Sequence, residues 1–198
     1  MTALAAARGR ANNSARLPMS VQPPRSFETA RLTACVPSVD DADEVFESYA
    51  SDLRVTRMLS WKAYTEVAPL RQFLADRRRD WEEDGPHLAW MLRLKTTARI
   101  IGSISAGVKG HAVCFGYVLA FDQWGKGLTA EALNYLTHWA LAQPAIFRAW
   151  AFCDAENEPS ARVMEKCGFE REGRLRRWHV CPTIGPEPRD CIVLSKTR

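Results

Sequence analysis

Three short apolar segments, separated only by turns and followed by an amphipathic helix, constrain the fold of this chain most. The segments cover residues 88–94, 99–107 and 112–119, with turn-forming residues at 95–97 and 109–110. Connections this short are typical of antiparallel neighbours, because parallel strands need a long crossover. The centre of the chain therefore predicts an antiparallel meander.

The helix after the meander has the strongest helical periodicity in the sequence. Its apolar side chains, Leu128, Ala132, Tyr135, Leu136 and Trp139, recur at a spacing that places them on one face. Weaker signals predict further helices that begin at Asp40 or Asp41, run from Pro69 to Gly85, and run from Asn157 through 166. Further strands are predicted over 31–36, 146–152, 169–174 and 190–194. The segment 51–65 is predicted to be a loop or a broken helix.

The order of these elements defines the expected fold class. Strands and helices follow one another as β, α, α, β, β, β, α, β, α, β, β. This order predicts a mixed α/β domain, with a central, twisted, largely antiparallel sheet of six to seven strands flanked by about four helices. The segment 180–188 is rich in proline and is expected to be a loop.

Charge is distributed unevenly along the chain. The 198 residues include 27 lysines and arginines against 23 aspartates and glutamates, but four arginines and no acid fall within the first 26. We expect a tail over 1–26, either disordered or a targeting segment, and one electrically neutral domain over 27–198. A neutral domain argues against nucleic-acid binding, and no apolar run approaches the ~20 residues that span a membrane.

Six cysteines are scattered through the chain, without a CxxC pair or a histidine cluster beside them. This spacing predicts that the chain binds no metal, because zinc sites need clustered ligands. We expect reduced thiols that pack as small apolar residues in a cytoplasmic protein.

The segment between the meander and its helix, Trp124-Gly125-Lys126-Gly127-Leu128-Thr129, carries the clearest functional signal. The two glycines let the backbone turn and let a ligand approach its amides. A helix N-terminus favours an anion, and Lys126 adds positive charge. The residues therefore predict a phosphate or pyrophosphate cradle, although it matches neither a P-loop nor a dinucleotide fingerprint. The alternative is a glycine-rich turn into a core helix.

A second group of motifs favours the phosphate cradle over the simple glycine-rich turn. Asp154-Ala155-Glu156-Asn157-Glu158-Pro159-Ser160 follows one expected strand, and Glu165-Lys166-Cys167-Gly168-Phe169 follows the next helix. With the glycine segment, they resemble the GNAT superfamily of acyl-CoA-dependent N-acetyltransferases. More narrowly, they resemble its branch of ribosomal-protein N-terminal acetyltransferases and their small-molecule relatives. The resemblance covers nearly all of 27–198 and includes Glu28-Thr29-Ala30-Arg31-Leu32, Glu131-Ala132-Leu133 and Glu172-Gly173-Arg174-Leu175-Arg176.

The resemblance implies that acetyl-CoA binds along one strand and the glycine segment. The strand at 115–120 would splay from its neighbour and pair its backbone, at Val118 and Leu119, with the pantetheine arm. The segment from Trp124 to Thr129 would hold the pyrophosphate. Thr129 departs from the Gly or Ala usual at its position, and it would either crowd a phosphate or donate its hydroxyl to one.

The resemblance also assigns roles to the helix after 157. Asn157 would bond the pantetheine, with a helix N-cap as the alternative. Ser160 would donate a hydrogen bond to the leaving thiolate, unless it only satisfies a helix amide. Arg162 and Lys166 would reach the 3′-phosphate, unless they are ordinary surface charges.

The implied reaction is direct transfer of an acetyl group from acetyl-CoA to an amine. Orientation and a backbone N–H on the splayed strand would supply most of the acceleration. The amine must lose a proton, and the sequence leaves Glu131, Asp154 and Glu156 open as the base. Cys153 and Cys167 are poor candidates for a nucleophile, since neither has a histidine partner in sequence.

The acceptor implied is a primary amine, either on a protein N-terminus or on a small molecule. Its site would lie near the early helices and the C-terminal hairpin, the regions that hold Trp61, Tyr64, Trp81, Trp178 and His179. An idle acyl-CoA-binding or sensing module is the alternative to an enzyme. The chain is expected to be a monomer or a homodimer.

Overall fold

The computed structural model describes residues 21–85 and 87–198. In this part of the chain, eight strands form one sheet in the order β1-β2-β3-β4-β5-β6-β8-β7. Neighbouring strands are antiparallel except β5 and β6, which run parallel. The strands are β1 (Ser26–Glu28), β2 (Leu32–Cys35), β3 (His87–Leu94), β4 (Ile100–Lys109), β5 (Ala112–Leu119), β6 (Arg148–Asp154), β7 (Glu170–Val180) and β8 (Pro188–Thr197).

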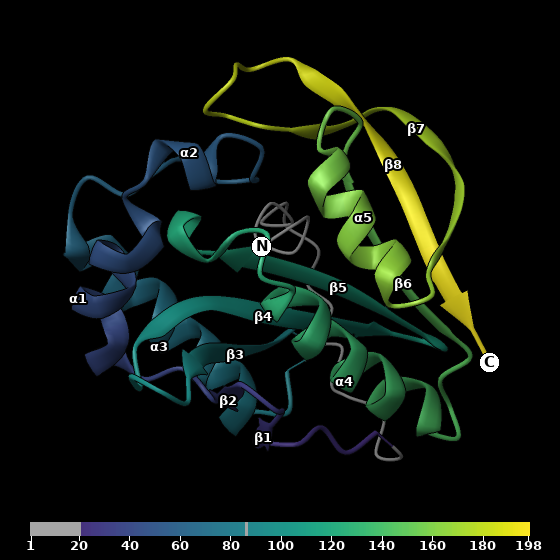
Figure 1. Cartoon of the computed structure of the whole chain (residues 1–198), viewed down its shortest axis with the longest axis horizontal. Helices are drawn as coiled ribbons and strands as arrows, with labels where there is room; N and C mark the ends of the chain where they lie inside the picture. Colours follow the sequence, from purple (N-terminus) through teal and green to yellow (C-terminus); the bar gives the residue numbers. More distant parts are fainter. Residues whose placement is uncertain (1–20, 86) are drawn as a thin grey trace.

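Five α-helices in the described residues flank this sheet (Figure 1). They are α1 (Ala42–Val45), α2 (Leu53–Thr56), α3 (Val67–Glu82), α4 (Leu128–Ala142) and α5 (Glu158–Lys166), with short helical turns η1 (Val39–Asp41), η2 (Phe46–Ala50) and η3 (Phe121–Gln123). The predicted mixed α/β fold is confirmed. The sheet has one strand more than expected, because β1 is only three residues long and begins inside the predicted tail.

The first helical segment has a different cap from the one predicted. The Ser38 hydroxyl accepts a hydrogen bond from the Asp40 amide at 3.3 Å, and the Asp41 carboxylate accepts one from the Ser38 amide at 2.8 Å. This reciprocal pair is a capping box. Ser38 is therefore the N-cap, and Asp41 supports it from inside the first turn.

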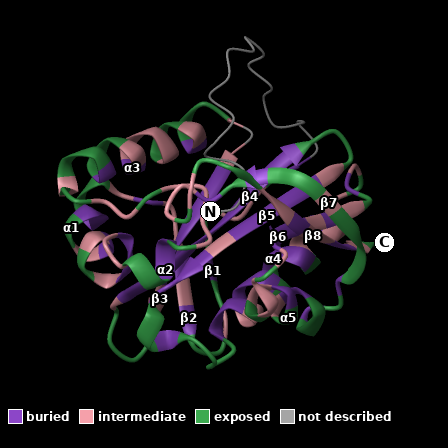
Figure 2. Cartoon of the chain, turned by 90° about the horizontal axis from the view of Figure 1, so that it is seen from above, coloured by how far each residue is buried: buried purple, intermediate pink, exposed green. Residues whose placement is uncertain are grey.

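The sheet carries a hydrophobic core on each face. On one face, Met91, Ile100 and Val118 pack against residues of α1, η2 and α3. On the other, Phe115 and Ile104 belong to a cluster with residues of α4 and α5. Figure 2 shows the strands as a mostly buried layer with exposed helix surfaces outside it. Because successive side chains of a strand point to opposite faces, β5 contributes to both cores.

The parallel pair β5 and β6 separates soon after it forms. Pairing extends only from Ala112↔Arg148 to Cys114↔Trp150. Beyond that point, β5 remains paired with β4 and β6 with β8. The sheet therefore opens into a wedge between the C-terminal ends of β5 and β6, and α4 and α5 follow those ends (Figure 1).

Residues 21–26, which the charge pattern assigns to the tail, pack on the domain. Val21 is buried, and the indoles of Trp90 and Trp139 donate to the carbonyls of Pro24 at 2.8 Å and Gln22 at 2.9 Å. The packed chain therefore extends upstream to residue 21, and the rest of the predicted tail lies outside the described residues. Across 21–85 and 87–198, no helix has the length and apolar character needed to cross a bilayer.

Candidate active site

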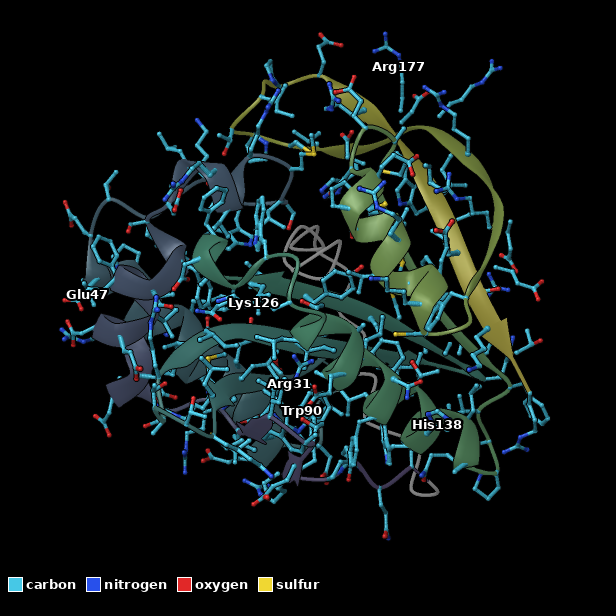
Figure 3. The ribbon with its side chains drawn as sticks, in the orientation of Figure 1. Arg31, Glu47, Trp90, Lys126, His138 and Arg177 are labelled. Carbon is cyan, nitrogen blue, oxygen red and sulfur yellow. The ribbon has the colours of Figure 1, made fainter. Side chains whose placement is uncertain are left out.

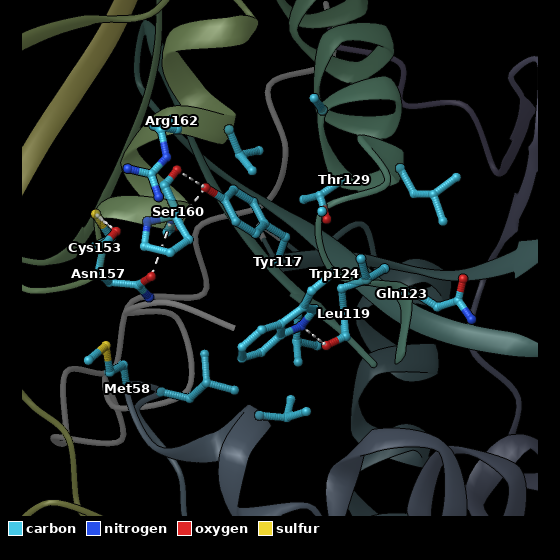
Figure 4. A pocket seen from close by; sticks show the side chains of 18 of the residues that line it. Met58, Tyr117, Leu119, Gln123, Trp124, Thr129, Cys153, Asn157, Ser160 and Arg162 are labelled. Atoms are coloured by element: carbon cyan, nitrogen blue, oxygen red, sulfur yellow. Dashed lines mark hydrogen bonds between the residues drawn. The ribbon is translucent and has the colours of Figure 1, made fainter. Parts of the chain in front are cut away.

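A cleft of about 500 Å³ lies at the wedge. Its walls come from the α2 segment, β5, the glycine turn with the start of α4, and the first turns of α5 (Figure 4). The structure thus brings together motifs that are far apart in sequence. The predicted site residues among its lining are Val118, Leu119, Trp124, Gly125, Gly127, Leu128, Thr129, Asn157, Ser160, Arg162 and Lys166.

The glycine turn has the geometry of an anion cradle. Gly125 and Gly127 both adopt the left-handed conformation, with φ of 77° and 76°, which side chains with a Cβ disfavour. Gly127 leads directly into α4, so the first amides of a 15-residue helix border the cleft. Nothing lies within 4 Å of a Cβ built on Gly125. The turn is therefore open to a phosphate, and the donors present fit a pyrophosphate.

Lys126 is the one predicted site residue that does not line the cleft in the described chain. Its Nζ donates to Gln123 Oε1 at 3.1 Å, and its carbonyl accepts from Arg31 Nη1 at 2.9 Å. Figure 3 shows Arg31 and Lys126 near the N-terminal end of α4. Lys126 therefore takes part in holding the turn through its backbone, rather than placing its charge in the cleft.

The edge of β5 presents backbone groups to the wedge. Because the Ala120 amide donates to Ile101 of β4 at 2.7 Å, strand alternation directs the N–H and C=O of Leu119 to the opposite edge. The Trp124 indole confirms that direction, since its Nε1 donates to the Leu119 carbonyl at 2.8 Å. A strand edge of this kind can pair with an amide-containing ligand.

The first turn of α5 places two predicted residues in the cleft. Asn157 is the helix N-cap, and its side chain accepts from the Ser160 amide at 3.2 Å. The N-cap alternative is therefore correct, and Asn157 lines the cleft as well. The Ser160 hydroxyl does not cap the helix; it lies 2.8 Å from the Tyr117 hydroxyl of β5.

The three carboxylates left open as a base have different surroundings. Glu131 accepts hydrogen bonds from Thr29 and Arg31 and lies outside the cleft lining. Burial raises its pKa, but those hydrogen bonds outweigh burial and hold the pKa below its usual range. The Asp154 side chain is buried and paired with Arg189. Burial by itself raises the Asp154 pKa, but the hydrogen bonds from Arg189 and from the Glu156 amide outweigh it and hold the pKa below its usual range. Glu156 lines the cleft, and its exposed carboxylate shares Arg189 with Asp154, at 2.8 Å from Arg189 Nη2.

The thiols do not have the character of nucleophiles. Cys153 lines the cleft beside Ser160, and burial raises its pKa to about 12. Burial also raises the pKa of Cys167, to about 11. Both groups are therefore neutral thiols near pH 7.

One wall of the cleft was not predicted from the sequence. Arg54, Val55, Arg57, Met58 and Leu59 line it from α2 and the residues after it. This wall belongs to the segment 51–65, whose side chains follow no clear period, so no local pattern could have identified it. Of the aromatic residues expected near the acceptor, Trp61, Tyr64, Trp81, Trp178 and His179, none lines this cleft, and Trp81 is part of the core.

A family model described as an acetyltransferase (GNAT) domain matches residues 31–170, most of the chain. The chain belongs to the GNAT acetyltransferase family. It is similar to an uncharacterized N-acetyltransferase, p20, from Bacillus licheniformis, with 30% identity over 152 residues that cover 75% of this chain and 84% of the relative.

Solved structures resemble this GNAT acetyltransferase closely in fold. The microcin C7 self-immunity acetyltransferase MccE, solved with acetyl-CoA and AMP, matches with a TM-score of 0.79 at 21% identity, covering 89% of this chain and 98% of that one. A ribosomal-protein-S5-alanine acetyltransferase from Vibrio fischeri matches with a TM-score of 0.74 at 22% identity, covering 87% and 96%.

Family membership makes the chain an acetyltransferase, with acetyl-CoA as its acetyl donor. The expectation of an acetyltransferase enzyme is thus confirmed. Within the described residues there is no group of three or more His, Cys, Asp or Glu that could hold a metal ion.

Proposed function

We propose that this GNAT acetyltransferase transfers the acetyl group of acetyl-CoA directly to a primary amine, on a protein N-terminus or on a small molecule. The observation that carries the proposal is the position of Ser160. Its hydroxyl lies in the wedge between β5 and β6, in the same cleft as the glycine turn. One cleft thus joins an anion cradle, a stretch of β5 edge that no strand pairs with, and a hydroxyl donor.

The cleft residues divide the binding of acetyl-CoA between them. The amides from Gly125 to Thr129 hold the pyrophosphate, supported by the α4 dipole. The second lone pair of the Leu119 carbonyl and the Asn157 side chain bind the pantetheine amides. Arg162 and Lys166, both exposed and both on the cleft wall, neutralise the remaining phosphate charge.

Acetyl-CoA supplies the thioester carbonyl and the thiol leaving group. Three groups of the chain then assist the transfer: the Leu119 N–H, the Ser160 hydroxyl and the Glu156 carboxylate. The Leu119 N–H polarises a carbonyl placed against the β5 edge, and the Ser160 hydroxyl donates a hydrogen bond to the departing sulfur. Glu156, the one carboxylate among the cleft residues of the described chain, accepts the amine proton directly or through one water.

The acceptor reaches the cleft along the α2 wall. Val55, Met58 and Leu59 provide apolar contacts there, and Arg57 is exposed beside them. The cleft is partly open to solvent, and this wall lies across it from the start of α5 (Figure 4). An open entrance accommodates the first residues of a protein chain as well as a free amine.

Two measurements test the proposal. Calorimetry with acetyl-CoA tests binding, and thiol release is then followed over a panel of amines and short peptides. We expect tight binding and CoA release with one amine class. Binding without release in any member, or no binding at all, contradicts the proposed transfer.

Variants assign the roles of the residues. Ser160→Ala and Glu156→Gln should each lower kcat by roughly 10²-fold with little change in acetyl-CoA affinity. Glu47→Gln is the matched control, because Glu47 is exposed on η2 and lies away from the cleft (Figure 3). Unchanged kcat in Glu156→Gln would remove Glu156 from the mechanism.

A further inference from the structure

Tyr117 and Ser160 form a link across the open wedge of the sheet. The Tyr117 hydroxyl lies 2.8 Å from Ser160 Oγ and 2.9 Å from the Ser160 carbonyl, to which it donates. Figure 4 shows both contacts as dashed lines from the ring to the start of α5. The two residues are 43 positions apart in sequence.

The position of Tyr117 on β5 explains why it can make this link. It lies three residues beyond Cys114, the last residue of β5 that pairs with β6. Its side chain packs with the core on the α4 and α5 face, and it lines the cleft. Where the strands separate, a long side chain is needed to span the gap, and the tyrosine ring supplies that length.

The two contacts allow only certain hydrogen directions. Tyr117 has one hydroxyl hydrogen and two acceptors on Ser160. When that hydrogen points to the carbonyl, Ser160 Oγ–H donates to the tyrosine oxygen. When it turns to Ser160 Oγ, the serine hydrogen is free for another acceptor, either the neighbouring Cys153 sulfur or a group bound in the cleft. Both arrangements keep every proton on its own oxygen, and they differ only by rotation of the two hydroxyls.

We propose that Tyr117 is a positioning residue, which holds the Ser160 hydroxyl and directs its hydrogen to the sulfur that leaves acetyl-CoA. The inference rests on the role proposed above for Ser160. The amine nitrogen forms the new bond to the acetyl carbon while the carbon–sulfur bond breaks with its electron pair on sulfur. As sulfur gains charge, Tyr117 donates to Ser160 Oγ and so strengthens the donation from Ser160.

Tyr117 is suited to remain a donor throughout the working pH range. Burial raises its pKa well above the usual value, and the hydrogen bond with Ser160 offsets only part of that rise. The phenol therefore stays protonated at neutral and moderately alkaline pH.

A double-mutant cycle with Tyr117→Phe and Ser160→Ala tests the inference. Tyr117→Phe should lower kcat by about tenfold, the effect of one lost hydrogen bond, and leave the KM for acetyl-CoA nearly unchanged. In the Ser160→Ala background the same change should cost almost nothing further, since Tyr117 acts through Ser160. Replacement by 3-fluorotyrosine, which retains the hydroxyl, should restore kcat.

The outcomes separate the two proposals. If Ser160→Ala lowers kcat but Tyr117→Phe does not, or if the two losses simply multiply, the role of Tyr117 is wrong while that of Ser160 stands. If Ser160→Ala leaves kcat unchanged, the role of Ser160 fails, and with it the inference. Tyr135→Phe on α4 is the matched control; this ring stacks on Phe27 and is not part of the cleft lining. Circular dichroism and acetyl-CoA calorimetry establish that each variant is folded.

Discussion

Arg31 and Glu131 join the start of β2 to the first turn of α4. Glu131 accepts from the Arg31 amide at 2.8 Å and from its Nε at 2.7 Å, and the same guanidinium donates to the Lys126 carbonyl at 2.9 Å. One arginine therefore holds both the glycine turn and the helix that follows it. The Glu131 charge at a helix N-terminus adds to this stabilisation.

Loss of the Glu131 charge should loosen the glycine turn. Glu131→Gln removes the charge-assisted bonds to Arg31, so we expect unfolding to become easier by about 1–2 kcal/mol and the KM for acetyl-CoA to rise about three- to tenfold. The kcat should change little. Asp43→Asn, which breaks the exposed pair with Arg71, is the control and should shift stability by less than about 0.5 kcal/mol. An equal KM for acetyl-CoA in the wild type and in Glu131→Gln would contradict the role of the Arg31–Glu131 pair in holding the glycine turn.

The left-handed backbone at Gly127 should be needed for binding as well as for stability. Gly127→Ala and Gly110→Ala each place a Cβ at positive φ, with φ of 76° and 57°, so each should cost about 1–2 kcal/mol in chemical denaturation. Gly110 is in the β4–β5 turn, away from the cleft. Calorimetry should therefore show weakened acetyl-CoA binding for Gly127→Ala alone. Equal affinities in the two variants would argue against the cradle.

The Thr129 hydroxyl should act as a donor in the cradle. Thr129 lines the cleft, and across residues 21–85 and 87–198 its hydroxyl has no hydrogen-bond partner, so it is available to a ligand. We expect Thr129→Ala to weaken acetyl-CoA binding about three- to tenfold, and Thr129→Ser to retain it. Tighter binding by Thr129→Ala would instead show that the threonine crowds the phosphates.

Glu172 should make the protein sensitive to acid. Its hydrogen bonds with Arg148 and Ser195 lower its pKa to about 2, whereas the pKa of a glutamate in the unfolded chain is ~4.3. The stabilisation is therefore complete above ~4.3 and is lost as the pH falls toward 2. Because the pair is partly exposed, it should contribute less than about 1 kcal/mol.

Denaturant titrations over a range of pH check the Glu172 prediction. The difference in unfolding free energy between wild type and Glu172→Gln should be constant near neutrality and shrink below ~4.3. Glu187→Gln is the control, because Glu187 forms its ion pair with Arg177 at the exposed end of the hairpin. A difference that grows as the pH falls would contradict the expected direction.

Local patterns predicted the regular elements well. The expected strand at 112–119 is β5, and the helix from Leu128 is α4. Gly168 has the left-handed φ of 79° that its place after α5 predicts. Each of these depends on neighbours in sequence: alternation along a strand, a helical stripe, or a glycine at a helix end. The strands β7 and β8 extend beyond the predicted 169–174 and 190–194. Nearly every residue of β7 is exposed, so its sequence carries no alternation of apolar and polar side chains.

Contacts between distant segments were not predictable in the same way. The side chains of the α2 wall follow no period in sequence. The sequence is compatible with Glu131 as a base or as a structural residue, and its contact with Arg31 in the folded chain makes it structural. Likewise, Ser160 had no identified partner before β5 brought Tyr117 to it. Motif residues could be assigned by type and spacing, but their hydrogen-bond partners are set by how the sheet folds.

The sequence by itself determined the elements, the glycine turn and the family to which its motifs point, because these depend on local backbone preference and on residue spacing. Tertiary structure alone decided the opening between β5 and β6 and the α2 wall of the cleft. It also decided that Glu156, rather than Glu131 or Asp154, is the carboxylate in the cleft. The physical reason is that a cleft forms where strand pairing ends. Where pairing ends depends on packing from both faces of the sheet, which no single segment encodes.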